Sequence, residues 1–239
     1  MPPAPPELRE MSTDRPDTTE SPFTVDAGHF QFELEIAAWE RSGRHTTLNL
    51  GELNLKAGMT SSTDLQLVLP LYSRTQHSDG PEGFGDVTVR LKHNLWGNDG
   101  GPTAFGIMPF LKIPTARSGL GNGAVEGGLI LPFSFSLPGN WDAAVMSEID
   151  FAADDEGDHH HAVFVTSFTT SHAITENTAG FMELVSVLDT RSGSGAQAYF
   201  NTGLTWKPSA RWQLDGGLRT GLTADSADFT PFLGCSAKF

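Results

Sequence analysis

The residues whose types could do chemistry lie in a few segments. Asp154-Asp155-Glu156-Gly157-Asp158-His159-His160-His161 combines carboxylates with imidazoles, which suit divalent cations, but neighbours in one loop converge poorly on a single ion. His93 is the natural candidate for a Ser–His hydrolase, yet no Gly-x-Ser-x-Gly motif accompanies it. The glycine-rich segment 119–128 lacks the Gly-Lys-Ser/Thr of a phosphate-binding loop. We therefore expect a solvated acidic loop, no catalytic residue, no metal, no cofactor and no enzymatic activity.

Most other polar side chains recur at alternate positions, opposite apolar ones. His29-Phe30-Gln31-Phe32-Glu33-Leu34-Glu35-Ile36 is typical, and this period of two predicts a half-buried strand. If the apolar side chains face lipid, the polar ones line a lumen. The predicted lumen residues, which carry both signs of charge with acids in excess, are Gln31, Glu33, Glu35, Asp64, Gln66, Asp86, Arg90, Lys92, Lys112, Glu126, Glu148, Glu183, Gln197, Asn201, Asp215 and Arg219.

Twelve segments follow this pattern, and about 18 residues per repeat leave room for the roughly 9–11 residues of a tilted membrane-crossing strand and a connection. We predict an all-β protein, a transmembrane antiparallel up-and-down β-barrel of about twelve strands. The expected strands lie near 28–36, 46–56, 64–69, 86–92, 104–113, 125–137, 141–152, 161–171, 179–189, 196–206, 210–221 and 228–239. Long connections alternate with tight turns, which predicts long loops on one rim and short turns on the other, with both termini on the short-turn rim.

The aromatic residues agree with this topology. It places Trp96, Trp141, Trp206 and Trp212 at the short-turn rim and Trp39 at the other, where aromatic girdles meet lipid headgroups. Alternatively, tryptophan marks strand ends in a soluble barrel. The last strand closes on Phe239, like the terminal signal that the barrel-assembly machinery recognises in bacterial outer-membrane proteins.

Composition excludes several classes of protein. No apolar stretch approaches the ~18 residues of a spanning helix. The formal net charge of −14 argues against nucleic acid as a partner, and the single Cys235 can form neither an internal disulfide nor a thiolate metal site. The N-terminus has no signal peptide, so we expect that an export signal has been removed or replaced.

Two parts are expected along the chain. Residues 1–27 hold six of the fifteen prolines and form an extended leader, and 28–239 form the barrel. The leader residues Thr13, Asp14, Arg15, Pro16, Glu20, Ser21 and Pro22, together with Gly28–Glu33 and Lys112-Ile113-Pro114-Thr115, resemble the MetA-pathway-of-phenol-degradation family, transporter-like proteins of Gram-negative envelopes. The resemblance implies an outer-membrane barrel more firmly than it implies a substrate.

Several functions remain open at this point. A charged lumen suits a hydrated pore for small solutes, with aromatic or hydrophobic compounds as one class, and acids would favour cations or neutral solutes. It equally suits a structural network of ion pairs in a non-conducting barrel. The third hypothesis is a soluble periplasmic barrel that binds a small ligand. The leader could plug the lumen, cover the short-turn rim or be an unstructured spacer.

Two local features conflict with regular strands. Pro70, Pro109, Pro132 and Pro231 fall inside predicted strands, where each removes a ladder hydrogen bond, so we expect bulges or shifted registers there. The second strand changes phase near Gly51-Glu52, which predicts a bulge.

Overall fold

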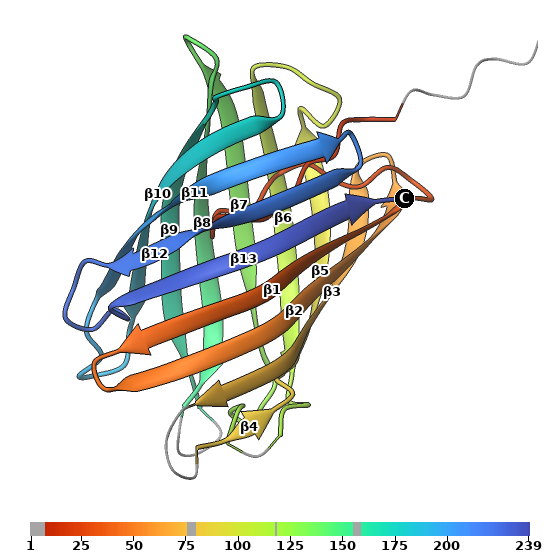
Figure 1. Cartoon of the computed structure of the whole chain (residues 1–239). Coiled ribbons are helices and arrows are strands. Elements are labelled where there is room, and N and C mark those ends of the chain that lie inside the picture. Colours follow the sequence, from red (N-terminus) through yellow and green to blue (C-terminus); the bar gives the residue numbers. More distant parts are fainter. Residues whose placement is uncertain (1–7, 76–79, 118, 155–158) are drawn as a thin grey trace, which may run out of the picture.

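The computed structural model describes residues 8–75, 80–117, 119–154 and 159–239. Within these residues thirteen strands form one antiparallel sheet, and pairing of β2 with β3 closes twelve of them into a barrel (Figure 1). The strands are β1 (Phe30–Ser42), β2 (His45–Thr60), β3 (Thr63–Thr75), β4 (Glu82–Gly83), β5 (Val87–Trp96), β6 (Thr103–Ile113), β7 (Glu126–Leu137), β8 (Trp141–Ala153), β9 (His160–Ala173), β10 (Thr178–Asp189), β11 (Gln197–Ser209), β12 (Trp212–Gly221) and β13 (Phe229–Lys238). The predicted fold is confirmed. The structure corrects it in one place, because β4 pairs with β3 inside the connection expected to be a loop.

The two rims differ as predicted. Long connections, including the one that carries β4, join strands at one end, and short turns such as Ser61–Ser62 join them at the other. Strand β1 starts and β13 ends at the short-turn rim, where the backbone amide of Phe30 donates to the carbonyl of Phe239 at 3.2 Å. Figure 1 shows the C-terminus and the leader, drawn in red, at the same end of the barrel.

The barrel is apolar outside and polar inside. Leu65, Leu91 and Leu204 are among many large apolar side chains that remain exposed on the outer wall. Inside, Lys92, Glu33 and Asp64 are buried almost completely. In the described part of the chain no helix is long and apolar enough to cross a bilayer.

The strand prolines interrupt ladders without shifting them. The pairing of β5 with β6 skips Pro109, that of β6 with β7 skips Pro132, and that of β1 with β13 skips Pro231. The pairing of β3 with β5 ends at Val68, just before Pro70. Each proline therefore faces a gap on the side where its missing N–H would have donated, and no register shift occurs at any of them.

The phase change in β2 occurs where expected. Gly51 has a φ of 75° and drops out of the ladders with β1 and β3, although the registers are the same on both sides of it. Next to it, the pairing of β1 with β13 shifts between Glu35 and Ala37. The predicted irregularity is thus shared by two neighbouring strands.

Candidate functional site

The described part of the leader, residues 8–27, folds into the barrel from the short-turn rim. Met11, Thr19 and Val25 are each less than 5% exposed, as in a protein core. We call residues 14–20 the tip and residues 8–12 with 22–26 the neck. Where the neck meets the tip, the hydroxyl groups of Ser12 and Ser21 lie 2.8 Å apart.

Asp14 is the most strongly held residue of the tip. Its carboxylate accepts hydrogen bonds from Lys56, from Lys92 at 2.5 Å and from the backbone amide of Ser21 at 3.0 Å. Burial by itself would raise the pKa of Asp14, but the two ammonium groups hold it below its ordinary value. Lys56 also pairs with Glu33, so one charged cluster joins the leader to β1, β2 and β5.

Two wall carboxylates bind backbone amides of the tip. Glu33 accepts from Asp14 N at 2.9 Å and Arg15 N at 3.0 Å. Glu183 on β10 accepts from Thr18 N at 3.0 Å and Thr19 N at 2.7 Å. Successive N–H groups are a general anion-binding arrangement, so the barrel recognises the shape of this loop as well as its charges.

Glu183 is reinforced by side chains on both sides. Thr19 Oγ1 donates to it at 2.6 Å, and Asn201 Nδ2 on β11 donates at 2.6 Å. Thr19 Oγ1 also lies 2.7 Å from Ser167 Oγ on β9. Burial and the charge of Glu183 raise the pKa of the neighbouring leader residue Asp17 well above its usual range.

Arg15 connects the tip to β1 and β12 through its side chain. Its guanidinium donates to Asp215 at 2.7 Å and to Glu35 at 3.3 Å, and Glu35 also accepts from Arg219 at 2.8 Å. Burial would lower the pKa of Arg15, but the two carboxylates raise it. A Cβ atom at Gly234 would collide with this guanidinium, so glycine makes room for it.

Glu20, the last residue of the tip, has a hydrogen-bond partner for only one of its two carboxyl oxygens among the described residues. One carboxyl oxygen accepts from Arg90 at 2.7 Å, and the other is buried with no hydrogen-bond partner among the described residues. Burial and the nearby Asp14 charge, only partly offset by Arg90, raise the pKa of Glu20 to about 7.

The neck is held by a second ion-pair cluster at the rim. Asp26 accepts from Arg9 at 2.7 Å and from Lys238 at 2.5 Å, and Arg9 lies 3.5 Å from Asp99. Burial by itself would raise the pKa of Asp26, but Lys238 and Arg9 together lower it. Close approach of the leader backbone at Asp26 leaves no room for a side chain at Gly58.

The tip separates two cavities. A cavity of about 440 Å³, here the long-loop cavity, lies on the side of the long loops. A cavity of about 360 Å³, here the short-turn cavity, lies on the side of the short turns. Arg15, Pro16 and Asp17 line both. The shortest route between the cavities therefore passes the leader tip.

The predicted lumen residues fall into three groups. Gln31, Glu33, Glu35, Asp64, Arg90, Lys92, Glu183, Asn201, Asp215 and Arg219 touch the leader or a residue that does, and Gln66 bonds to Asp64. Lys112 forms a separate cluster near the long loops, 2.5 Å from Glu126 and 3.9 Å from Asp86. Glu148 lines the long-loop cavity, and Gln197 accepts from the Tyr199 hydroxyl.

Sequence reasoning missed other inward-facing residues. Lys56, Glu52 and Asn54 lie beyond the phase change of β2, which hid them, and Glu40 follows the matching irregularity in β1. Apolar side chains also face the lumen, and Met108, Ile130 and Met146 form a buried cluster there. The alternating pattern could not reveal these last three residues, because they are apolar side chains at positions where the pattern predicts polar ones.

The remaining predicted residues lie at the rims. Trp96, Trp141, Trp206 and Trp212 lie near the ends of strands that meet the short turns, whereas Trp39 lies near the long loops and packs on Phe229. Phe239 stacks on Phe32 beside Trp212. His93 bonds to Thr63 on the neighbouring strand at 2.8 Å.

Part of the acidic loop, residues 155–158, lies outside the described residues. His161 contacts Asp154 at 2.7 Å and Asp189 at 3.4 Å. Among the described residues no group of three or more His, Cys, Asp or Glu side chains is arranged to hold a metal ion.

Comparison with known families identifies the chain. Residues 13–239, which include the leader tip and the whole barrel, match the family described as "Putative MetA-pathway of phenol degradation". The chain belongs to this family. A search of curated proteins finds no significant match.

Three solved structures with the same fold are described as channels or porins. The COG4313 outer membrane channel from Pseudomonas putida F1 superposes with a TM-score of 0.68 at 15% identity, over 95% of this chain and 100% of that one. The NanC porin gives 0.60 at 9% identity, over 88% and 100%. The CymD monoaromatic hydrocarbon channel gives 0.52 at 9% identity, over 90% and 89%. At these identities the likeness shows the fold: this family member shares the antiparallel β-barrel of these proteins.

Proposed function

We propose that this protein is an outer-membrane channel for small solutes in which the described part of the leader, residues 8–27, is a displaceable plug. The observation that carries the proposal is the division of the lumen at Arg15–Asp17 into two water-accessible cavities. A barrel built only for rigidity has no need of cavities on both sides of its plug. The named channels among the solved structures of this fold are consistent with a solute pathway.

The proposal places the apolar outer wall in outer-membrane lipid, with the tryptophans and Phe239 at the headgroup levels. The final strand, ending in Phe239, would be recognised by the barrel-assembly machinery. The predicted lumen residues become the wall of the solute pathway, and the leader residues Thr13–Pro22 become its gate.

The acidic character of the lumen bears on what passes. Eight Asp or Glu residues line the long-loop cavity against three arginines. Such a lining concentrates cations and repels anions, because charges in a narrow pore with low-dielectric walls are poorly screened. We propose a preference for cationic and neutral solutes. A reversal potential that shows anion preference in planar bilayers would refute this part.

Single-channel recording of a chain lacking residues 8–27 tests the plug. We expect a several-fold higher conductance than in the full chain, since the tip lies between the two cavities of the lumen. A heat-modifiable band on unboiled gels shows that the deleted chain still folds. Equal conductance of the two folded proteins would exclude the plug and favour a barrel that does not conduct.

A further inference from the structure

The long-loop cavity holds more negative charge than the leader contacts use. Of its acids, Asp14, Glu20, Glu33 and Glu35 are paired with lysine or arginine. In contrast, Asp17, Glu40 and Glu52 form no ion pair with any described residue. Glu148 contacts another acid, Asp150. Four of the eight carboxyl groups that line the cavity therefore have no cation in direct contact among the described residues, and their charge needs a cation or protons to be tolerable there.

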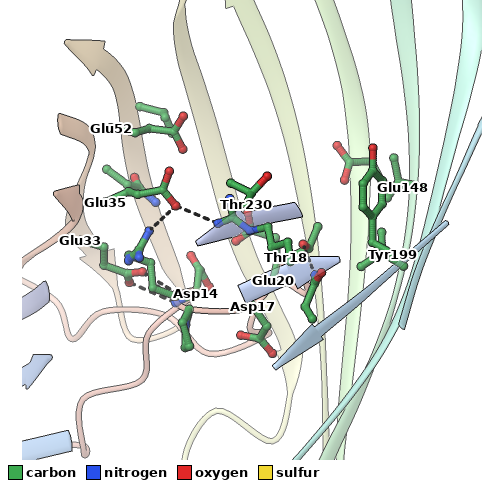
Figure 2. A pocket seen from close by; sticks show the side chains of 18 of the residues that line it. Asp14, Asp17, Thr18, Glu20, Glu33, Glu35, Glu52, Glu148, Tyr199 and Thr230 are labelled. Atoms are coloured by element: carbon green, nitrogen blue, oxygen red, sulfur yellow. Dashed lines mark hydrogen bonds and ion pairs between the residues drawn. The ribbon is translucent and has the colours of Figure 1, made fainter. Parts of the chain in front are cut away.

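The same cavity has an apolar side. Val165 on β9, Val185 and Val187 on β10 and the ring of Tyr199 on β11 line it next to one another, because β9, β10 and β11 are adjacent strands. Figure 2 shows Glu35 and Glu52 on one side of the cavity and Tyr199 with Glu148 on the other. A purely ionic pore does not need an apolar wall, which gains nothing from contact with hydrated ions.

A polar group at the floor of the cavity is left without a partner. Asn201 is 2% exposed, and its amide nitrogen donates to Glu183 and to Thr18. Among the described residues, its carbonyl oxygen has no hydrogen-bond donor, although the residue lines the cavity. Buried carbonyl groups are normally satisfied, so a donor from outside the chain is expected here.

From these observations we propose that the long-loop cavity binds a small protonated amine with a short apolar body. The ammonium group contacts Glu40, Glu52 or Glu148 and supplies N–H donors, and the apolar body lies against Val165, Val185, Val187 and Tyr199. A volume of about 440 Å³ is within the usual range for small-molecule sites. The inference rests on the proposed function, because it treats this cavity as the outer part of the solute pathway.

Other occupants satisfy only half of the site. An inorganic cation neutralises the carboxylates but leaves the apolar wall against water. A neutral alcohol covers that wall but leaves the carboxylates uncompensated, and a carboxylate solute is repelled. The combination of charge and apolar surface therefore selects the amine.

Calorimetric titration of the full chain in detergent at low ionic strength tests the proposal. The probes are n-butylammonium, n-butanol, butyrate and potassium, each corrected for its heat of mixing with empty micelles. We expect n-butylammonium to bind about tenfold or more tightly than n-butanol, a difference of about 1.4 kcal/mol. We expect neither butyrate nor potassium to saturate. Equal binding of the amine and the alcohol, or no binding of the amine, would overturn the proposal.

Variants separate the two halves of the site. Combining Glu40→Gln, Glu52→Gln and Glu148→Gln should remove the preference for the amine and leave n-butanol binding unchanged. Val187→Asn should weaken both probes. Glu176→Gln, in the short-turn cavity, is the matched control and should change neither. Binding at equilibrium requires no conduction, so the two proposals can fail separately. If the channel conducts but the amine does not bind, only the amine site is refuted. If the amine binds but the barrel does not conduct, the amine site is supported and the channel function is refuted.

Discussion

The leader is held at its tip and at its neck by the same kinds of side chain, in very different surroundings. At the tip, Asp14 and Lys92 are 7% and 1% exposed. At the neck, Arg9 and Asp26 are 18% and 15% exposed, and Asp99, the outer partner of Arg9, is 87% exposed. Exposed ion pairs contribute about 0–1 kcal/mol, whereas removing one partner of a buried pair costs about 3–5 kcal/mol. The position of the leader is therefore decided in the lumen, and the neck acts mainly as a tether.

The largest effect of a single substitution is expected for Asp14→Asn. It leaves buried Lys92 without its carboxylate partner, while Lys56 keeps Glu33. If water entry reduces the cost to about 3 kcal/mol, the ratio of open to plugged channels rises by about two orders of magnitude. The open fraction in single-channel recordings measures this ratio.

Arg9→Gln is the matched change at the neck. It also removes one charge from a leader ion pair, but Asp26 keeps Lys238. We expect an open fraction close to that of the unchanged protein. An effect as large as that of Asp14→Asn would show that the comparison between tip and neck is wrong.

A smaller effect is expected from pH. The pKa of Glu20 is about 7 in the plugged state, and a hydrated leader restores an ordinary value near 4.5. Because the plugged state then holds the proton more tightly, its stability is full below about pH 4.5 and is lost as pH rises through 7. Asp17, whose pKa is also raised, acts in the same direction.

We therefore expect more frequent opening at pH 8 than at pH 5, measured in single-channel recordings. Glu20→Gln should weaken this dependence. Asp14 has a lowered pKa and stays ionised throughout this range, so it does not oppose the trend. More frequent opening at pH 5 would contradict the assignment.

Much of the fold follows from the sequence, because successive side chains of each strand face the apolar outside and the polar lumen in turn. Phe30, Phe32 and Leu34 face outward while Gln31, Glu33 and Glu35 face inward, as the period of two requires. The site was only partly predictable. Lys56 and Glu52 follow Gly51, where the positive φ breaks the period, so their phase could not be extrapolated.

The leader shows a different limit. Its residues carry no period, and its position depends on contacts such as that between Arg15 and Asp215, which are 200 residues apart in the chain. Family resemblance pointed to the leader residues, but the sequence did not decide whether the leader is a plug, a cover of the rim or a spacer. Only the fold brings Glu33 and Glu183 to the backbone amides that they bind.

A reversible cross-link tests the central claim, that conduction requires the tip to leave the wall. Thr19→Cys with Ser167→Cys, in a Cys235→Ser background, replaces two hydroxyls 2.7 Å apart on the tip and on β9. Ser12→Cys with Ser21→Cys is the control, because it joins two leader residues 2.8 Å apart without attaching them to the barrel. We predict that the oxidised tip-to-wall pair stays in the low-conductance state and that reduction restores opening, while the control opens in both states. Equal conductance of the tip-to-wall pair before and after reduction would contradict the account.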